Sequence, residues 1–339
     1  MRRPKSPFCV LTFLILQPAV ARGEPPVNSG ATVTPAVIAV EIDVQRFRDS
    51  ATLKATDLDL NKIAPYASTA TITIEDVDKV SIVASVPEGA DALNAINGNL
   101  EGKQSPFGFQ FKVQLNDSEK AAKTFKKLTE KLEEAIVDGR VYYRNPSGGD
   151  GAANFTMHRP SANTILAGTD DFVESGNANL MSTDLRQAWQ KLPNQSARLA
   201  VDLQAMRALL KEFKEKNAAD PNQVLLISFI ENLDAMRLAI DLDASSLITL
   251  VLTGKDDQST TMMQAQLDSI VLLAQSQGAE KLSQLPPKSQ PVVSDLLKTL
   301  KTQRDENDIS LVLTRPDGFE DALAELTKLF APERLLIQP

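Results

Sequence analysis

Apolar and polar positions along this chain form an order of elements that occurs twice. Apolar runs at residues 36–42 and 197–203 predict two strands, and a short helix follows each of them. Alternating apolar positions at residues 74–82 and 230–238 predict a second pair of strands, which align with each other without a gap. The matching order indicates that the two parts of the chain share one plan.

A third pair of strands and a pair of helices continue this order. Phe109, Phe111 and Val113 alternate along the strand predicted at residues 107–115, and their counterparts are Ile248, Leu250 and Leu252. Each strand ends in an acidic, polar turn that resembles a helix cap. Apolar residues at helical spacing then predict a helix in each half, formed by Ala121, Phe125, Leu128 and Leu132 in the first and by Met263, Leu267, Val271 and Ala274 in the second.

The last matching pair is residues 155–160 with residues 311–316, and each of these strands ends in Arg-Pro. Acidic residues at Asp171 and Glu320 then begin another short helix in each half. A repeat of this length indicates a duplicated domain rather than a solenoid, whose repeating units are shorter.

We therefore predict an α+β fold built from two homologous domains, at residues 36–180 and 195–335. Short turns between successive strands favour a mostly antiparallel sheet in each domain, covered by helices on one face. The stretch 181–194 is predicted to be a linker helix, in which Trp189 is a packing residue. The pattern leaves open whether the halves form separate sheets or one continuous sheet.

The halves differ at one place. The first has the strand-like residues 141–144 and a loose turn at 145–151, whereas the second has an amphipathic helix at residues 291–300. Such a difference arises either from a function specific to one copy or from neutral drift in loops.

The first 21 residues have the features of a cleavable signal peptide. Cations at Arg2, Arg3 and Lys5 precede an uncharged apolar run, which is shorter than the roughly 20 residues that span a bilayer. Pro18 and the small-residue sequence ending at Ala21 fit a cleavage site before Arg22. We therefore expect an exported protein, periplasmic or extracellular, in which residues 22–35 are a flexible linker.

Charge and cysteine content narrow the possible functions. The formal net charge of the whole chain is −8, and the leader removes three of its cations, so nucleic acid is a poor partner for the acidic mature chain. The only cysteine, Cys9, lies in the leader, so the mature protein is expected to have no disulfide and no thiolate nucleophile. No later segment is apolar enough to predict an integral membrane span.

Catalytic and metal motifs are weak or absent. One histidine, His158, is predicted to be a solvent-facing strand residue rather than a general base, because no serine motif accompanies it. Residues 57–61 resemble the start of an EF-hand loop, but Lys62 and Ser68 stand where the loop needs Gly and Glu. Phosphate-binding loops are also absent from the sequence. We therefore assign no catalytic, cofactor-binding or metal-binding residue and expect no cofactor.

Two apolar features remain as candidate binding surfaces. The aromatic row Phe107, Phe109 and Phe111 is typical of a core between a sheet and a helix, and it could alternatively line a cavity for an apolar ligand. The helix at residues 292–300 could dock a partner. Partners are therefore an unknown protein or a small apolar ligand, and the sequence leaves the oligomeric state open.

The leader, the duplicated halves and the segment 161–168, which leads through a short strand to an acidic helix start, loosely resemble exported bacterial proteins of uncharacterised function with duplicated α+β halves. This resemblance implies no activity. The favoured interpretation is an exported, non-catalytic binding or scaffolding protein. The alternatives are a periplasmic carrier of an apolar, lipid-like ligand and a hydrolase that uses carboxylates, the latter less favoured because no particular carboxylate pair stands out.

Cleavage of the leader gives the first testable prediction. The protein recovered from the exported fraction should have an intact mass that corresponds to a chain beginning at Arg22, with no thiol that reacts with an alkylating reagent. A mass that retains residues 1–21 would contradict the signal-peptide interpretation.

Overall fold

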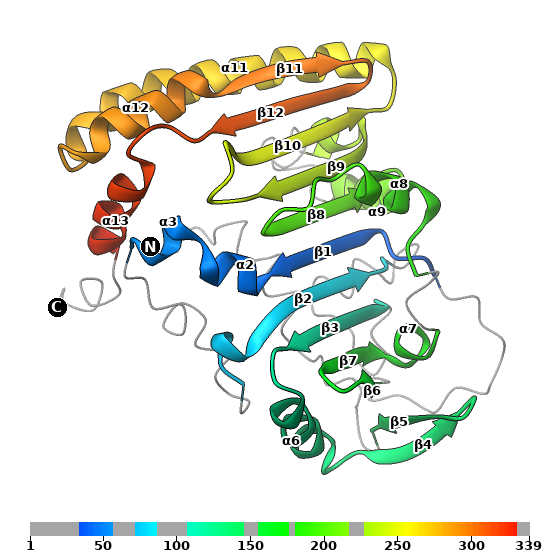
Figure 1. Cartoon of the computed structure of the whole chain (residues 1–339). Coiled ribbons are helices and arrows are strands. Elements are labelled where there is room, and N and C mark those ends of the chain that lie inside the picture. Colours follow the sequence, from blue (N-terminus) through cyan, green and yellow to red (C-terminus); the bar gives the residue numbers. More distant parts are fainter. Residues whose placement is uncertain are drawn as a thin grey trace.

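The computed structural model describes residues 34–56, 72–86, 107–145, 155–175, 180–216 and 227–330. Seven strands come from the first part of the chain: β1 (Ile38–Asp43), β2 (Val77–Ala84), β3 (Phe109–Leu115), β4 (Glu133–Val137), β5 (Arg140–Arg144), β6 (Phe155–Ser161) and β7 (Thr164–Thr169). Five come from the second: β8 (Ala197–Asp202), β9 (Leu233–Ile240), β10 (Ser246–Gly254), β11 (Lys301–Asp305) and β12 (Asp308–Thr314). They form one antiparallel sheet (Figure 1), in the order β11-β12-β10-β9-β8-β1-β2-β3-β7-β6-β5-β4.

The described helices vary widely in length. They are α2 (Val44–Asp49), α3 (Ala51–Lys54), α6 (Ser118–Thr129), α7 (Asp170–Glu174), α8 (Thr183–Gln190), α9 (Arg207–Lys216), α11 (Asp257–Lys281), α12 (Ser289–Thr299) and α13 (Phe319–Phe330). Two short 3₁₀ turns lie at Ile74–Asp76 and Leu282–Gln284. The α+β class predicted from the sequence is therefore confirmed.

The two parts of the chain join at the centre of the sheet. β1 pairs with β2 on one side and with β8 on the other, with Ala39 opposite Ala200 and Glu41 opposite Arg198. In Figure 1 the blue strand β1 lies beside the green strand β8. Of the two arrangements that the sequence left open, the structure has one continuous sheet rather than a separate sheet for each half, and backbone hydrogen bonds between β1 and β8 cover the edge that either half would otherwise expose. That the halves are homologous domains stays a prediction.

From this centre the strand order is similar in both directions. It runs β1-β2-β3-β7 on one side and β8-β9-β10-β12 on the other. β12 lies beside β10 as β7 lies beside β3, so β12 corresponds to β7 in position. The sequence pattern instead matches residues 311–316, which include the end of β12, with residues 155–160, which lie in β6, and this match is corrected. Helix α7, of five residues, follows β7 and helix α13, of twelve, follows β12, in agreement with the acidic helix starts seen in the sequence.

The predicted difference between the halves lies where the sheet ends. The first half continues through β6 into the hairpin β5-β4, whereas the second ends at β11 and has the helix α12 before that strand. Residues 146–154, which include most of the predicted loose turn, lie outside the described residues, as do the leader and most of the linker 22–35.

Acidic residues cap the start of α6, which follows β3, and of α11, which follows β10. Asp117 accepts hydrogen bonds from the backbone N–H groups of Glu119 and Lys120 at the start of α6. Asp256 accepts one from the N–H of Ser259 at the start of α11. These bonds satisfy amide groups that a first helical turn leaves unpaired, and they lower the pKa of both carboxyls. The acidic turns seen in the sequence are therefore helix caps.

Helices pack on both faces of the sheet, which corrects the prediction of helices on one face. Side chains alternate along β1, so Ile38 and Ala39 point to opposite faces. Ile38 belongs to a core with Met263 and Leu267 of α11, while Ala39 belongs to a core with Leu185 of α8. Helix α6 covers the Ile38 side as well, through Ala121 and Phe125.

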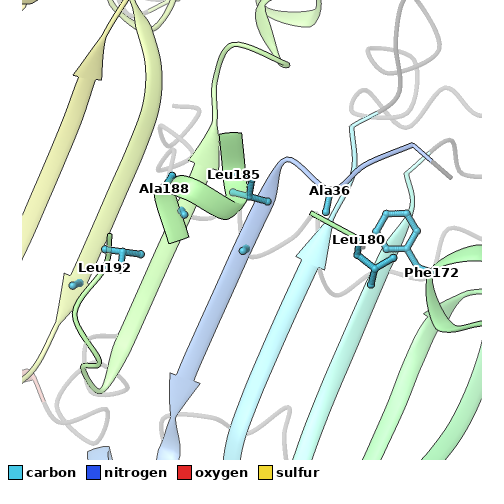
Figure 2. Close-up of a cluster of buried hydrophobic side chains, with 9 residues drawn as sticks. Ala36, Phe172, Leu180, Leu185, Ala188 and Leu192 are labelled. Atoms are coloured by element: carbon cyan, nitrogen blue, oxygen red, sulfur yellow. The ribbon is translucent and has the colours of Figure 1, made fainter. Parts of the chain in front are cut away.

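The helix predicted as a linker, α8, crosses the junction between the halves. Figure 2 shows Leu185 and Ala188 on α8 above the central strands, with Phe172 and Leu180 beside them. Small residues make this close approach possible, since Ala39, Ala200 and Ala239 form the floor under the helix. The predicted packing residue Trp189 is partly buried at the edge of this core.

A polar contact fixes α3 of the first half to the turn between β9 and β10. The carboxylate of Asp243 accepts hydrogen bonds from Ser50 Oγ at 2.8 Å, from the backbone N of Ala51 at 3.0 Å and from that of Thr52 at 3.2 Å. Burial acts to raise the pKa of Asp243, but these hydrogen bonds together lower it below its ordinary value. Nearby, Arg46 forms an ion pair with the buried Asp241 at 2.5 Å.

Asp243→Ala should destabilise the protein by about 1 kcal/mol at pH 7, because it leaves the N–H groups of Ala51 and Thr52 in the first turn of α3 without their acceptor. A carboxyl with a lowered native pKa stabilises the fold above the unfolded pKa of about 3.9, and this contribution is lost as the pH falls through the native pKa. Urea unfolding at pH 7 and at pH 2.5 measures both effects. The difference in the free energy of unfolding between the variant and the parent should be smaller at pH 2.5 than at pH 7.

The control is Asp317→Ala, since Asp317 is exposed and has no side-chain partner among the described residues. Equal losses for the two variants, or a loss for Asp243→Ala that does not change with pH, would contradict this role for Asp243.

Candidate functional site

An uncharged face covers most of the width of the sheet. Residues that are directly opposite each other in neighbouring strands lie on the same face of the sheet. The side that carries Ile38 is called the apolar face here. The strand register places three alternate residues of most central strands on this face. Every residue of this set is apolar: Ile38, Val40 and Ile42 in β1; Val80, Ile82 and Ala84 in β2; Phe109, Phe111 and Val113 in β3; Ile165 and Ala167 in β7; Ala197, Leu199 and Val201 in β8; Met236, Leu238 and Ile240 in β9; Ile248, Leu250 and Leu252 in β10; Ile309, Leu311 and Leu313 in β12.

One row of directly paired residues runs across the middle of the apolar face. This central row consists of Leu311, Leu250, Leu238, Leu199, Val40, Ile82, Phe111 and Ala167. It crosses eight neighbouring strands, which at a spacing of about 4.8 Å gives it a length of about 34 Å. Its side chains are all half-buried. The row is therefore a continuous apolar strip that retains access to solvent.

Helices bury the rows beside the central row, and three residues of the central row, Leu199, Leu250 and Ala167, pack against the edges of those cores. Ile309, Leu252 and Val201 in the neighbouring row are buried, in one core with Met263 and Leu267 of α11. At the other end, Leu115 and Ile165 are buried in the core under α6. Ile42 on the opposite side of the row keeps 38% of its surface exposed. The two helices thus leave the middle of the face partly open.

The aromatic residues singled out from the sequence lie on this face. Phe109 and Phe111 are in β3 and point to the Ile38 side, and both are half-buried, while Phe107 precedes the strand. Sequence reasoning identified this one strand and missed the residues that continue the row into the second half. Each strand's alternation was visible in the sequence, but the strand order that aligns them was not.

The opposite face carries charge at the same positions along the strands. Glu41 accepts hydrogen bonds from Arg198 Nε at 3.1 Å and Nη2 at 2.6 Å, and Lys79 Nζ lies 3.5 Å from the same carboxylate. The Arg198 guanidinium also lies over the Trp189 ring, 4.5 Å from its centroid. This side of the junction is therefore held by a half-buried polar cluster.

His158 also lies on the charged face, in β6. Its ring packs against Tyr142 with centroids 4.7 Å apart, and Nδ1 lies 2.8 Å from the carbonyl oxygen of Val141. It is half-buried, so the expected exposed position is only partly correct. Its described contacts bring no serine hydroxyl to the ring, and the geometry is that of a packing residue.

Half-buried carboxylates on the charged face are bound by arginines. Asp308 lies 2.5 Å from Arg237 and accepts a hydrogen bond from Thr253. Burial acts to raise the pKa of Asp308, but these two contacts together lower it below its ordinary value. Glu174 pairs with Arg144, and there burial dominates and raises the pKa of the carboxyl. Both carboxylates therefore act as partners of cations rather than as free acids.

Metal binding has no site in the part of the chain that the structure describes. No group of three or more His, Cys, Asp and Glu side chains lies close enough there to hold an ion. The EF-hand-like residues 57–61, with Lys62 and Ser68, fall outside the described residues.

The amphipathic helix of the second half is α12, as predicted. At its end a shallow pocket of about 400 Å³ is lined by Lys298, Thr299, Lys301, Gln303, Val312 and Thr314. The lining has two cations and no carboxylate, so this pocket does not provide the acid pair of a glycosidase.

Comparison with solved structures finds matches over most of the chain. Crystal form III of TP0453 covers 88% of this chain and 100% of its own, at 9% identity and a TM-score of 0.40. Crystal form IV covers 88% and 94% with a TM-score of 0.38, and crystal form I covers 87% and 94% with a TM-score of 0.36, each at 9% identity. TM-scores this low carry no argument about function.

No protein-family model and no curated protein matches the chain. Among the described residues, no helix combines the length and apolar character needed to cross a bilayer. The resemblance stated from the sequence therefore stays a prediction.

Arg198→Ala should lower the free energy of unfolding by about 1–3 kcal/mol, because it leaves the half-buried Glu41 with only the longer contacts of 3.5 Å to Lys79 and Ser81 among the described residues. It should also change the fluorescence of Trp189, the chain's one tryptophan, since the cation over the ring is lost. Urea unfolding followed by tryptophan emission measures both. Arg186→Ala, at an exposed position on α8, is the control and should change neither. An Arg198 variant that unfolds like the control would refute the stabilising role of this cluster.

Proposed function

We propose that this chain is an exported, non-catalytic binding protein whose ligand is an extended apolar molecule and whose binding surface is the central row. The observation that carries this proposal is the row itself: eight directly paired apolar side chains, all half-buried, flanked on the same face by cross-strand pairs that are apolar as well. Its length of about 34 Å suits a molecule with a long hydrocarbon chain.

The energetic argument rests on apolar burial. Removing apolar surface from water contributes a favourable free energy of about 25 cal/mol per Å², or about 0.8 kcal/mol for each CH₂ group that is buried. An extended chain that lies along the row would contact side chains of several strands at once. A charged or strongly polar ligand would instead lose its hydration on this face without finding a partner.

Further features support export and a role without catalysis. The leader fits a signal peptide. His158, the histidine considered as a general base, packs against Tyr142, and the half-buried carboxylate Asp308 is paired with Arg237. We also propose that the two halves are copies of one α+β unit, which the repeated order β1-β2-β3-β7 and β8-β9-β10-β12 supports.

A fluorescent fatty acid tests this function. The parent protein should bind 11-dansylundecanoic acid saturably, and Phe111→Ser should raise the dissociation constant about tenfold, since it removes most of one large apolar contact. Lys112→Ser is the matched control, because Lys112 is the next residue in β3 and points to the opposite face. Circular dichroism and thermal melting establish that both variants are folded.

The proposal fails if the parent shows no saturable binding, or if the Phe111 and Lys112 variants bind alike. A broad hydrolase screen with turnover that His158→Ala abolishes would contradict the non-catalytic role.

A further inference from the structure

The edge strand β11 leaves one side open for another chain. It pairs with β12 and ends the sheet, and within the described ranges no strand pairs with its outer side. Lys301, Gln303 and Asp305 are exposed along it. An unpaired strand edge offers a row of backbone donors and acceptors to a partner strand.

The charges of β11 complement those of a second copy of the same strand. In an antiparallel pair centred on Gln303, Lys301 of each copy lies opposite Asp305 of the other, and the two Gln303 residues face each other. Opposite charges directly across a strand pair are stabilising. Neither Lys301 nor Asp305 has a side-chain partner among the described residues, so both are available.

The other end of the sheet lacks this property. β4 begins with Glu133 and Glu134 and carries no cation. Two copies of β4 would bring four carboxylates to one seam without a compensating charge. Self-association is therefore favoured at β11 rather than at β4.

Helix α11 supplies apolar surface beside the same edge. Asp268 of α11 bonds to Thr302, and Arg304 bonds to Asp257 and Thr261, so the helix is fixed to β11 (Figure 1). Four of its large apolar side chains are nevertheless exposed: Met262 by 44%, Ile270 by 57%, Leu272 by 66% and Leu273 by 54%. Between Gln258 and Ala279 the helix has one charged residue, Asp268.

We propose that two copies of this chain form a symmetric dimer through antiparallel pairing of their β11 strands. A twofold axis normal to the sheet passes between the two Gln303 residues and keeps both α11 helices on one face of the joined sheet. A stable dimer buries about 800 Å² on each partner, more than a five-residue strand provides, and the exposed apolar residues of α11 supply further area.

Charge reversal tests this pairing by light scattering over a concentration series. The parent should be a dimer at micromolar concentration. Lys301→Asp should raise its dissociation constant at least about tenfold, because two attractive pairs become repulsive, and so should Asp305→Lys. The double variant Lys301→Asp/Asp305→Lys restores opposite charges and should restore the dimer. Lys288→Asp, an equal charge change at an exposed site outside β11, is the control.

A single thiol tests the register. The chain's one cysteine, Cys9, lies in the leader, so the mature protein with Gln303→Cys has one thiol, on the proposed axis. Directly opposed residues of an antiparallel pair lie about 4.5–5.5 Å apart at Cα, within disulfide range, so mild oxidation should give a covalent dimer. Lys288→Cys should not. A monomeric parent, a double variant without recovery, or equal cross-linking at 288 and 303 would each overturn the proposal.

Discussion

The pairing of β1 with β8 is the constraint on which the rest of this structure depends. Its register places Val40 opposite Leu199 and Glu41 opposite Arg198, so one face is apolar and the other charged. A slip by one residue would turn Glu41 toward the apolar face and leave Arg198 without its partner. The hydrogen bonds between Glu41 and Arg198, at 2.6 and 3.1 Å, favour the observed register over that alternative.

The two faces then take different roles. On the charged face the small residues Ala39, Ala200 and Ala239 let α8 pack closely across the junction. On the apolar face α11 and α6 cover regions beside the central row, and the row itself stays half-buried. The apolar face thus holds two of the buried cores as well as the central row, and the proposed function rests on the part of this face that stays half-buried.

Local features of the fold were predictable from the sequence, and long-range ones were not. Alternation and helix caps predicted β3, α6 and the cap Asp117 within a few residues, because they depend on neighbouring positions. The sharing of one sheet was left open, since it depends on hydrogen bonds between strands about 160 residues apart in the chain.

The same reason explains what was missed at the site. Phe109 and Phe111 could be recognised in the sequence because they form an aromatic row. Leu238 and Leu311 could not, because they belong to strands with ordinary apolar alternation. Only the strand order places them in line with Phe111. The match of β12 with β6 failed likewise, because the inserted hairpin β4-β5 and helix α12 separate the counterparts β7 and β12 from the preceding helices by different lengths.

Native mass spectrometry of the protein isolated from its own exported fraction, without denaturant, tests the central claim most directly. The account predicts an added mass at a fixed ratio to the polypeptide, which organic solvent extracts and which is reduced when Phe111 is replaced by Ser. The bare polypeptide mass in both the parent and the variant would contradict the assignment of the central row as a binding surface for an apolar ligand.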